Sequence, residues 1–250
     1  MTPEKYNEFL KTRRTAKVFE TDKKLTDTER QMLIDAVNYA PAQNSNRNFI
    51  PILVEKQEHK EWLQDNVFFM ISKYSDSLGK IMPREYQLGV LTAPAVIIYL
   101  EAMKGLPIVN HPSHLGADGS YLKEPEQGDL FIRNINIGMS MAFVAQQAYL
   151  MELDVGFNGC TRGIRHVMET PELRAQLYSI FNEYGITDEM ALRHGLSPGY
   201  AVCIGKGIPI ENPNSPTKMD LEGLPYKDGY YTNIKKHKLN SKENIRVINE

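Results

Sequence analysis

The chain has 250 residues, of which 42% are hydrophobic and 24% charged, and its formal net charge is −2. This composition is ordinary for a globular protein, and the near-neutral charge offers no general attraction to nucleic acid or to an anionic membrane. The two cysteines, Cys160 and Cys203, are too few for a disulfide framework and fit a reducing compartment. Because the N-terminal segment lacks the apolar core of a signal peptide, we expect a cytoplasmic protein without membrane or nucleic-acid partners.

Two helices are predicted near the N-terminus. The first spans residues 3–11, with Thr2 as its candidate N-cap. The second begins at a capping box that runs from Thr26 to Glu29. It ends before Pro41, because the residue before a proline avoids the helical conformation.

A cationic segment, TRRTAKVF, lies between these two helices. It places Arg13, Arg14 and Lys17 around the hydroxyl of Thr15. Cations at the end of a helix favour its macrodipole, so the segment can be interpreted as a solvated helix end. Guanidinium groups, a hydroxyl and free backbone amides also suit a dianionic phosphate, which is the functional interpretation.

A polar segment, YAPAQNSNRNF, follows the second helix and is rich in amide side chains. Since Asn and Ser favour turns, it can be a surface loop. It can also supply hydrogen-bond donors and acceptors for the polar edge of a planar ligand. A strand predicted over residues 50–54 follows at once and would hold the segment against a sheet.

The middle of the chain gives one clear strand and one long connection. We expect a helix over residues 59–70, in which Trp62 is a packing residue, and no regular structure over residues 72–92. The β-branched run at residues 94–100 predicts a strand covered on both faces. Residues 103–129 contain Pro and Gly, and we interpret them as a substrate-side loop, because loops of that length are usually functional.

The long connection contains three potential metal ligands, His111, His114 and Asp118. A catalytic zinc site commonly has three protein ligands, but Pro112 prevents the regular helical presentation of the two histidines. We therefore expect no metal site.

The longest predicted helix lies within residues 129–153 and is apolar nearly all round, so we expect it to be buried, with no face left for water. Gln146 and Gln147 interrupt the apolar run and argue against a membrane span. Small residues that would let another helix pack closely, in the same domain or in a second subunit, are Gly138, Ala142, Ala145 and Ala148. In the turn expected after the helix, Gly156 and Gly159 allow a backbone to approach a flat or charged group.

The C-terminal part is predicted to contain a helix over residues 171–182 and a strand over residues 199–205, in which Cys203 is buried. The chain from Gly207 onward lacks core periodicity and is either a solvated tail or an arm on a partner subunit. Interleaved helices and strands predict an α+β domain built around a sheet. The family resemblance described next implies that this domain covers residues 1–225 and is followed by an arm or tail over residues 226–250.

Five segments, in this order, resemble the nitroreductase family of flavin enzymes: TRRTAKVF, APAQNSNRNF, LTAPAVIIYL, LDVGFNGC and GYAVCIGKG. The resemblance implies an α+β fold with a mostly antiparallel central sheet. It also implies flavin mononucleotide (FMN) bound at the interface of a homodimer, with the long helix in that interface. The activity implied is an FMN-dependent oxidoreductase that uses NAD(P)H to reduce nitroaromatic, quinone or similar small-molecule acceptors by two-electron, ping-pong hydride transfer.

The resemblance also implies particular site residues. Those on the phosphate side are Arg13, Arg14, Thr15 and, from the C-terminal segment, Lys218. Those in the loop that closes over the cofactor of the partner subunit are Ala42, Gln43 and Asn44. Lys17 would have the catalytic role, because its ammonium group near flavin N1 and O2 would stabilise the negative charge that reduction creates. The backbone of Gly159 and Cys160 would lie near flavin N5.

The chain also departs from the family pattern. It has residues 45–49, Ser-Asn-Arg-Asn-Phe, where many members carry Asn-x-Gln-Pro-Trp, and residues 152–154, Glu-Leu-Asp, where Gly-Leu-Gly is usual. Gln87 is the candidate for the amide at the pyrimidine edge. These departures leave open the same fold with different flavin chemistry, as in a dehalogenase, an azoline dehydrogenase or a flavin-fragmenting enzyme. A flavin-binding protein without turnover also remains open.

Overall fold

A computed structural model describes most of the first 208 residues, which form one compact unit. The described residues are 2–12, 15–16, 18–42, 49–71, 84–86, 88–102, 127–159, 161 and 163–208. The boundary predicted after residue 225 lies outside them.

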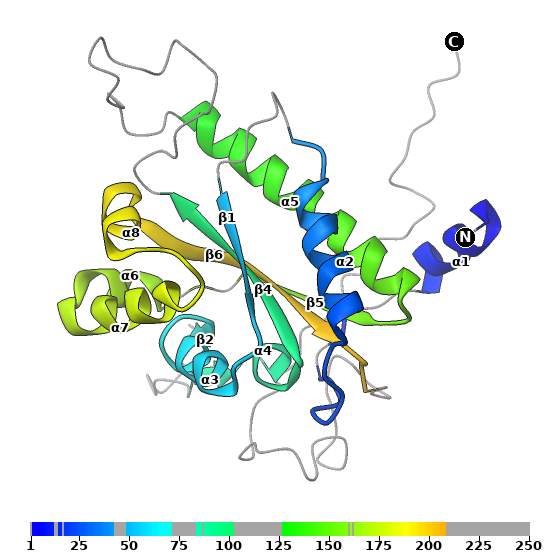
Figure 1. Cartoon of the computed structure of the whole chain (residues 1–250), viewed down its shortest axis with the longest axis horizontal. Coiled ribbons are helices and arrows are strands. Elements are labelled where there is room, and N and C mark those ends of the chain that lie inside the picture. Colours follow the sequence, from blue (N-terminus) through cyan, green and yellow to red (C-terminus); the bar gives the residue numbers. More distant parts are fainter. Residues whose placement is uncertain are drawn as a thin grey trace, which may run out of the picture. The chain divides into compact units, whose positions relative to one another are not determined.

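Helices and strands are interleaved along the chain (Figure 1). The helices are α1 (Pro3–Thr12), α2 (Asp27–Asn38), α3 (Gln57–Asn66), α4 (Leu88–Thr92), α5 (Gln127–Leu150), α6 (Ile164–Glu169), α7 (Pro171–Asn182) and α8 (Asp188–His194). The strands are β1 (Phe49–Val54), β2 (Phe69–Ile71), β3 (Arg84–Tyr86), β4 (Ala95–Ala102), β5 (Asp154–Asn158) and β6 (Leu196–Gly205).

The central sheet has four strands in the order β1-β4-β6-β5, and every neighbouring pair is antiparallel. Strands β2 and β3 form a separate antiparallel pair. The strands predicted from β-branched runs, β1, β4 and β6, are confirmed. The segment of strand β5 was predicted to be a turn. This prediction is wrong, because pairing with β6 holds the glycine-containing segment in an extended conformation.

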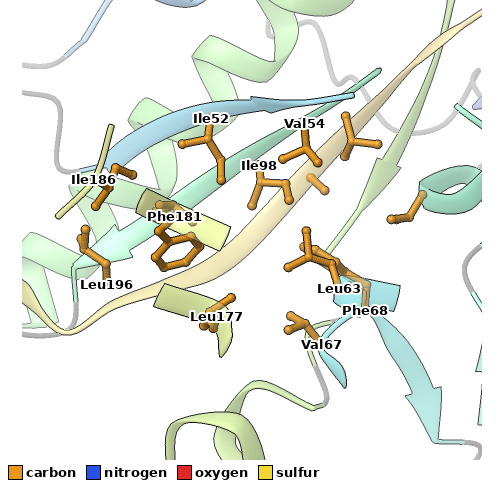
Figure 2. Packing of buried hydrophobic residues seen from close by; sticks show 14 of the residues in the cluster. Ile52, Val54, Leu63, Val67, Phe68, Ile98, Leu177, Phe181, Ile186 and Leu196 are labelled. Carbon is orange, nitrogen blue, oxygen red and sulfur yellow. The ribbon is translucent and has the colours of Figure 1, made fainter. Parts of the chain in front are cut away.

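Helices cover both faces of the sheet. On one face, α2 and α5 contribute Leu33, Val37, Val144 and Ala148 to a core with Ile97 and Tyr99 of β4. On the other face, Figure 2 shows Ile52, Val54 and Ile98 of the strands near Leu63 of α3 and near Leu177 and Phe181 of α7. The described chain is therefore a helix–sheet–helix arrangement of the α+β class.

Local signals in the sequence set several helix ends as predicted. Thr26 and Glu29 form the expected capping box at α2, and the amide of Lys5 donates to Thr2 Oγ1 at 3.4 Å at the start of α1. The helix expected over residues 59–70 ends earlier, at Asn66. The Gln64 side chain donates to the Phe68 carbonyl at 2.6 Å, which helps to hold the turn before β2.

Helix α5 is confirmed, but the prediction that it is buried all round is wrong. Its outward face exposes Ile135, Phe143 and Leu150, while Arg133 and Ser140 are buried. The small residues also lie on different faces, since Gly138 and Ala142 are exposed and Ala148 is buried. The polar groups thus point inward and part of the apolar surface points outward. Among the described residues, no helix is long and apolar enough to cross a membrane.

Helix α5 ends in a left-handed turn at Glu152, whose φ is 59°. The next amide, that of Leu153, donates to the Ala148 carbonyl at 2.9 Å, and the Glu152 amide donates to the Tyr149 carbonyl at 2.9 Å. These bonds cap the last carbonyls of the helix. The residue with the left-handed conformation in such a cap is usually glycine. Glu152 is therefore a strained residue at this position.

Replacing Glu152 by glycine is expected to raise the free energy of unfolding by about 1 kcal/mol, because glycine adopts the left-handed conformation without a Cβ clash. Urea denaturation measures the change. Glu152→Ala keeps the Cβ and is expected to give no such gain. An equal gain in both variants would show that the charge, and not the backbone, is responsible.

Candidate functional site

The cationic segment of the sequence is anchored to the sheet by its own backbone. The Ala16 amide donates to the Val155 carbonyl of β5 at 2.8 Å. Two residues later, the Val18 carbonyl accepts from the Ile208 amide at 3.0 Å. The Glu20 amide then donates to the carbonyl of Lys206 at 2.8 Å. We call this set of contacts the N-terminal seam.

Buried side chains fix the seam against the junction of α4 and β4. Val18 and Phe19 are fully buried, and the Phe19 amide donates to Thr92 Oγ1 at 3.1 Å. Gly205 leaves the necessary space, because a Cβ there would lie 2.4 Å from Cδ of Pro94 and 3.2 Å from Cδ1 of Phe19. The segment is thus held from two sides, by the strands and by Thr92.

Two glycines of the LDVGFNGC segment have different surroundings. At Gly156, a Cβ would lie 2.4 Å from the carbonyl oxygen of Ala16, so only glycine lets the seam approach β5. Gly159 is exposed, and a Cβ there would lie 3.3 Å from the Tyr200 ring. The close approach expected at Gly156 is present, but its partner is the chain's own carbonyl group and not the flat or charged group that was predicted.

The structure describes three of the predicted site residues. Thr15 is half-buried and precedes Ala16 of the seam, and Gly159 directly follows β5, which binds that seam. Ala42 is half-buried beyond the C-cap of α2, Tyr39. The predicted site residues outside the described part are Arg13, Arg14, Lys17, Gln43, Asn44, Cys160 and Lys218; Gln87, His111, His114 and Asp118 also lie outside it.

The seam contains residues that the sequence analysis did not single out. Asp154 Oδ2 accepts from the Gly207 amide at 2.9 Å, which joins the start of β5 to the chain after β6. Thr92 accepts the hydrogen bond from the Phe19 amide, and the Tyr200 ring lies beside Gly159. Their partners lie far away in sequence, so no local pattern identifies them.

A second cluster of titratable groups joins α3 to the end of α7. His59 Nδ1 is 3.0 Å from the Tyr184 hydroxyl, and His59 Nε2 is 3.2 Å from Glu183 Oε1. The other carboxylate oxygen of Glu183 pairs with Lys56. Burial, with the nearby Glu183 carboxylate, raises the pKa of Tyr184 to about 12, so this hydroxyl stays protonated at neutral pH. Within the described residues, no group of three or more His, Cys, Asp or Glu side chains could hold a metal ion. We interpret this cluster as a link between helices.

No family model and no curated protein sequence matches the chain, but solved structures match it closely in shape. NfrA1 of B. megaterium has a TM-score of 0.55 and 14% identity, with 92% of this chain and 76% of that chain covered. NfrA1 nitroreductase of B. subtilis has a TM-score of 0.54 and 14% identity, with 91% and 76% covered.

A Staphylococcus epidermidis protein described as an NAD(P)H:FMN oxidoreductase has a TM-score of 0.52 and 16% identity, with 86% of this chain and 92% of that chain covered. The chain has the nitroreductase fold. The resemblance stated from the sequence is confirmed at this level, together with the α+β class and the antiparallel sheet.

The described residues of this nitroreductase-like chain fit an FMN group. A phosphate needs hydrogen-bond donors and positive charge, and the seam holds the backbone on both sides of Lys17, directly after Thr15. A flat ring needs a backbone without bulk, and Gly159 supplies one that is exposed and has the Tyr200 ring beside it. The roles of the individual residues remain predictions.

Gly156→Ala is expected to lower the free energy of unfolding by about 1–3 kcal/mol, because its Cβ would overlap the Ala16 carbonyl, which the seam holds in place. Urea denaturation measures the loss. The matched control is Gly159→Ala, whose Cβ would meet only a half-buried ring and whose cost is expected to stay below about 1 kcal/mol. Equal costs in the two variants would contradict the role given to Gly156.

Proposed function

We propose that the chain is an FMN-dependent oxidoreductase that uses NAD(P)H to reduce nitroaromatic, quinone or similar acceptors. The observation that carries the proposal is the hydrogen bond of 2.8 Å between the Ala16 amide and the Val155 carbonyl. It joins the segment that bears the predicted phosphate ligands to β5, the strand that Gly159 directly follows. The nitroreductase fold supports the same cofactor, since the S. epidermidis neighbour is described as an FMN oxidoreductase.

Bound FMN would supply two-electron hydride chemistry between NAD(P)H and the acceptor. A quinone becomes a hydroquinone by taking up these two electrons and two protons, of which one comes from the nucleotide and one from solvent. The nucleotide leaves before the acceptor binds, which is a ping-pong order. No acidic or basic side chain is required for the hydride transfer itself.

The protein's part in this reaction is binding and electrostatic stabilisation. Arg13, Arg14 and Thr15 bind the phosphate, with Lys218 as a further cation. The Lys17 ammonium group stabilises the negative charge that appears on the ring during reduction, and therefore favours the reduced state over the oxidised one. Backbone amides at Gly159 and Cys160 would hold the ring edge, where the absence of a side chain at Gly159 would leave space for the ring.

We also propose that the chain acts as a homodimer through the layer formed by α2 and α5. Most of the exposed large apolar side chains described by the structure belong to this layer: Met32, Tyr39, Ile135, Phe143 and Leu150. An apolar surface on a helix with buried polar groups is typical of an interface between subunits. In this proposal, Ala42, Gln43 and Asn44 close over the cofactor of the partner subunit.

The purified protein is expected to be yellow with bound FMN and to bleach anaerobically on addition of NADH or NADPH. Arg13→Ala is expected to lose most of the FMN, and Lys17→Ala to keep it but to bleach about tenfold or more slowly. Absorbance spectra and anaerobic stopped flow measure both effects. The control, Arg165→Ala, removes an exposed cation from α6 and is expected to change neither.

A colourless protein that takes up no added FMN would contradict the proposed function. A yellow protein that neither nucleotide bleaches would instead be a flavin-binding protein without turnover. Bleaching without reduction of a nitroaromatic or quinone panel would favour the same fold with different flavin chemistry.

Phe143→Glu is expected to convert the dimer into a monomer, because it places a charge within the proposed apolar interface. Sedimentation velocity measures the mass, and the monomer is expected to lose FMN. The matched control is Leu192→Glu on α8, where the exposed fraction is 52% compared with 41% for Phe143. If Phe143→Glu stays a dimer, or if Leu192→Glu becomes a monomer, the proposal that α2 and α5 form the interface is contradicted.

A further inference from the structure

A half-buried tyrosine on β6, Tyr200, lies beside the exposed residue that follows β5. Strand β5 is at one edge of the central sheet, next to β6 (Figure 1). The last pair in their register is Asn158 with Ala201, so one position farther Gly159 lies opposite Tyr200. A Cβ at Gly159 would be 3.3 Å from Cδ1 and 3.4 Å from Cε1 of the Tyr200 ring. The aromatic ring is therefore in contact range of the glycine backbone.

The opposite side of Tyr200 has a rigid support. Tyr200 packs against the core between the sheet and the helices α2 and α5. Its partner on β4 is Tyr99, which is fully buried in the same core. The hydroxyls of Tyr99 and Ser140 share a hydrogen bond of 3.1 Å, and the Tyr99 ring packs against Phe49 at a centroid distance of 5.2 Å. Since β6 lies between β4 and β5, Tyr200 has this fixed residue on one side and Gly159 on the other.

An irregularity of the sheet lies directly before Tyr200. The pairing of β4 with β6 shifts register between Tyr99 and Leu100, which leaves Gly199 as an extra residue on β6, as in a β-bulge. Bulges change the direction of neighbouring side chains and are frequent next to active sites. A Cβ at Gly199 would overlap the carboxylate of Glu101, so only glycine fits this position. The backbone from which the Tyr200 side chain extends is therefore closely defined.

A tyrosine opposite a glycine can have a purely structural role. An aromatic ring that covers a strand glycine shields its backbone and strengthens the pairing of the two strands. In this chain, however, β5 ends at Asn158, and Gly159 is exposed although the ring lies beside it. The ring is therefore not needed to complete the pairing of β5 with β6, and part of it stays accessible.

Together, Gly159 and Tyr200 form a surface that suits a planar aromatic ring. Gly159 presents a backbone without a side chain, which lets a flat group come close. Tyr200 presents an electron-rich ring, and aromatic rings attract one another in offset or edge-to-face arrangements beyond the effect of the area that they bury. A flat ring placed at Gly159 would meet the Tyr200 ring, because the two residues are neighbours on the same face of the sheet.

We infer that Tyr200 is a contact residue for the flavin ring, at the ring edge beside Gly159. This inference rests on the proposed function, which assigns that edge to the backbone at Gly159. It adds a side chain at a position where the sequence motif supplies only backbone groups. Tyr200 has no acid or base role in this inference: its ring packs against the flavin ring and excludes water from that edge.

The test uses the fluorescence of bound FMN. An excited flavin takes an electron from a tyrosine in contact with it and returns the electron at once, so contact quenches the fluorescence without a net reaction. Phenylalanine is a much poorer electron donor. Tyr200→Phe is therefore expected to lengthen the fluorescence lifetime of bound FMN severalfold. Because an aromatic ring is kept, the dissociation constant of FMN is expected to change less than about twofold.

A second variant, Tyr200→Leu, removes the ring. It is expected to lengthen the lifetime at least as much and to weaken FMN binding by about threefold to tenfold, which corresponds to the loss of one aromatic contact. Time-resolved fluorescence of the FMN-loaded protein measures the lifetimes. Equilibrium dialysis of the loaded protein against falling concentrations of FMN measures the dissociation constants.

The matched control is Tyr178→Phe, the same chemical change in a tyrosine of α7. Tyr178 is buried in the core on the other face of the sheet, so this variant is expected to change neither the lifetime nor the affinity. An unchanged lifetime in Tyr200→Phe would overturn the inference and leave Tyr200 as cover for Gly159. An equal increase in Tyr178→Phe would also overturn it, because the effect would not belong to the position of Tyr200.

If Tyr200→Leu does not fold, Tyr200→Phe decides, since it keeps the packing of the ring against the core. An original protein that takes up no FMN would overturn the proposed function and, with it, this inference. A protein that binds FMN but shows the same lifetime in Tyr200→Phe would overturn the inference alone. The uptake of FMN, measured first, therefore separates the two failures.

Discussion

The arrangement of the described chain depends on the backbone hydrogen bonds of the N-terminal seam. Ala16 is bound to β5, and Val18 and Glu20 are bound to the chain that follows β6. Backbone bonds of this kind do not depend on side-chain identity, but they require close approach, which Gly156 and Gly205 permit. Ala16 and Val18, the described residues on either side of Lys17, are thereby attached to the sheet, and a binding site of defined geometry requires a backbone held in this way.

The fold could be predicted where the signal is local. The capping box at Thr26 and the β-branched run at residues 94–100 each depend on neighbouring residues, and both predictions are confirmed. Strand β5 was missed because Asp154 and Gly156 favour a turn locally, and its extended form depends on β6. The partial exposure of α5 was missed because its apolar residues point in every direction, so periodicity does not reveal which side faces the sheet.

Sequence patterns named candidate site residues, but they could not give the geometry around them. The assignment of the RRTAK segment and the glycines after α5 to one site stays a prediction, and the structure shows that Ala16 of that segment is hydrogen-bonded to Val155, beside Gly156. The sequence did not identify Thr92, Asp154 or Tyr200, because a single Thr, Asp or Tyr carries no signal until its distant partner is known. The solved structures add fold-level support at 14–16% identity, where backbone similarity persists although residue matches are few.

The bond between Val18 and Ile208 connects the beginning of the described fold to its end. During synthesis, a ribosome releases the first helices long before it has made the residues that complete this ladder. Val18 and Glu20 therefore cannot form their bonds to residues 206–208 until all four strands of the sheet have been made. Docking of residues 18–20 would therefore be one of the last events in the folding of the described unit, after β6 and residues 206–208 have been made.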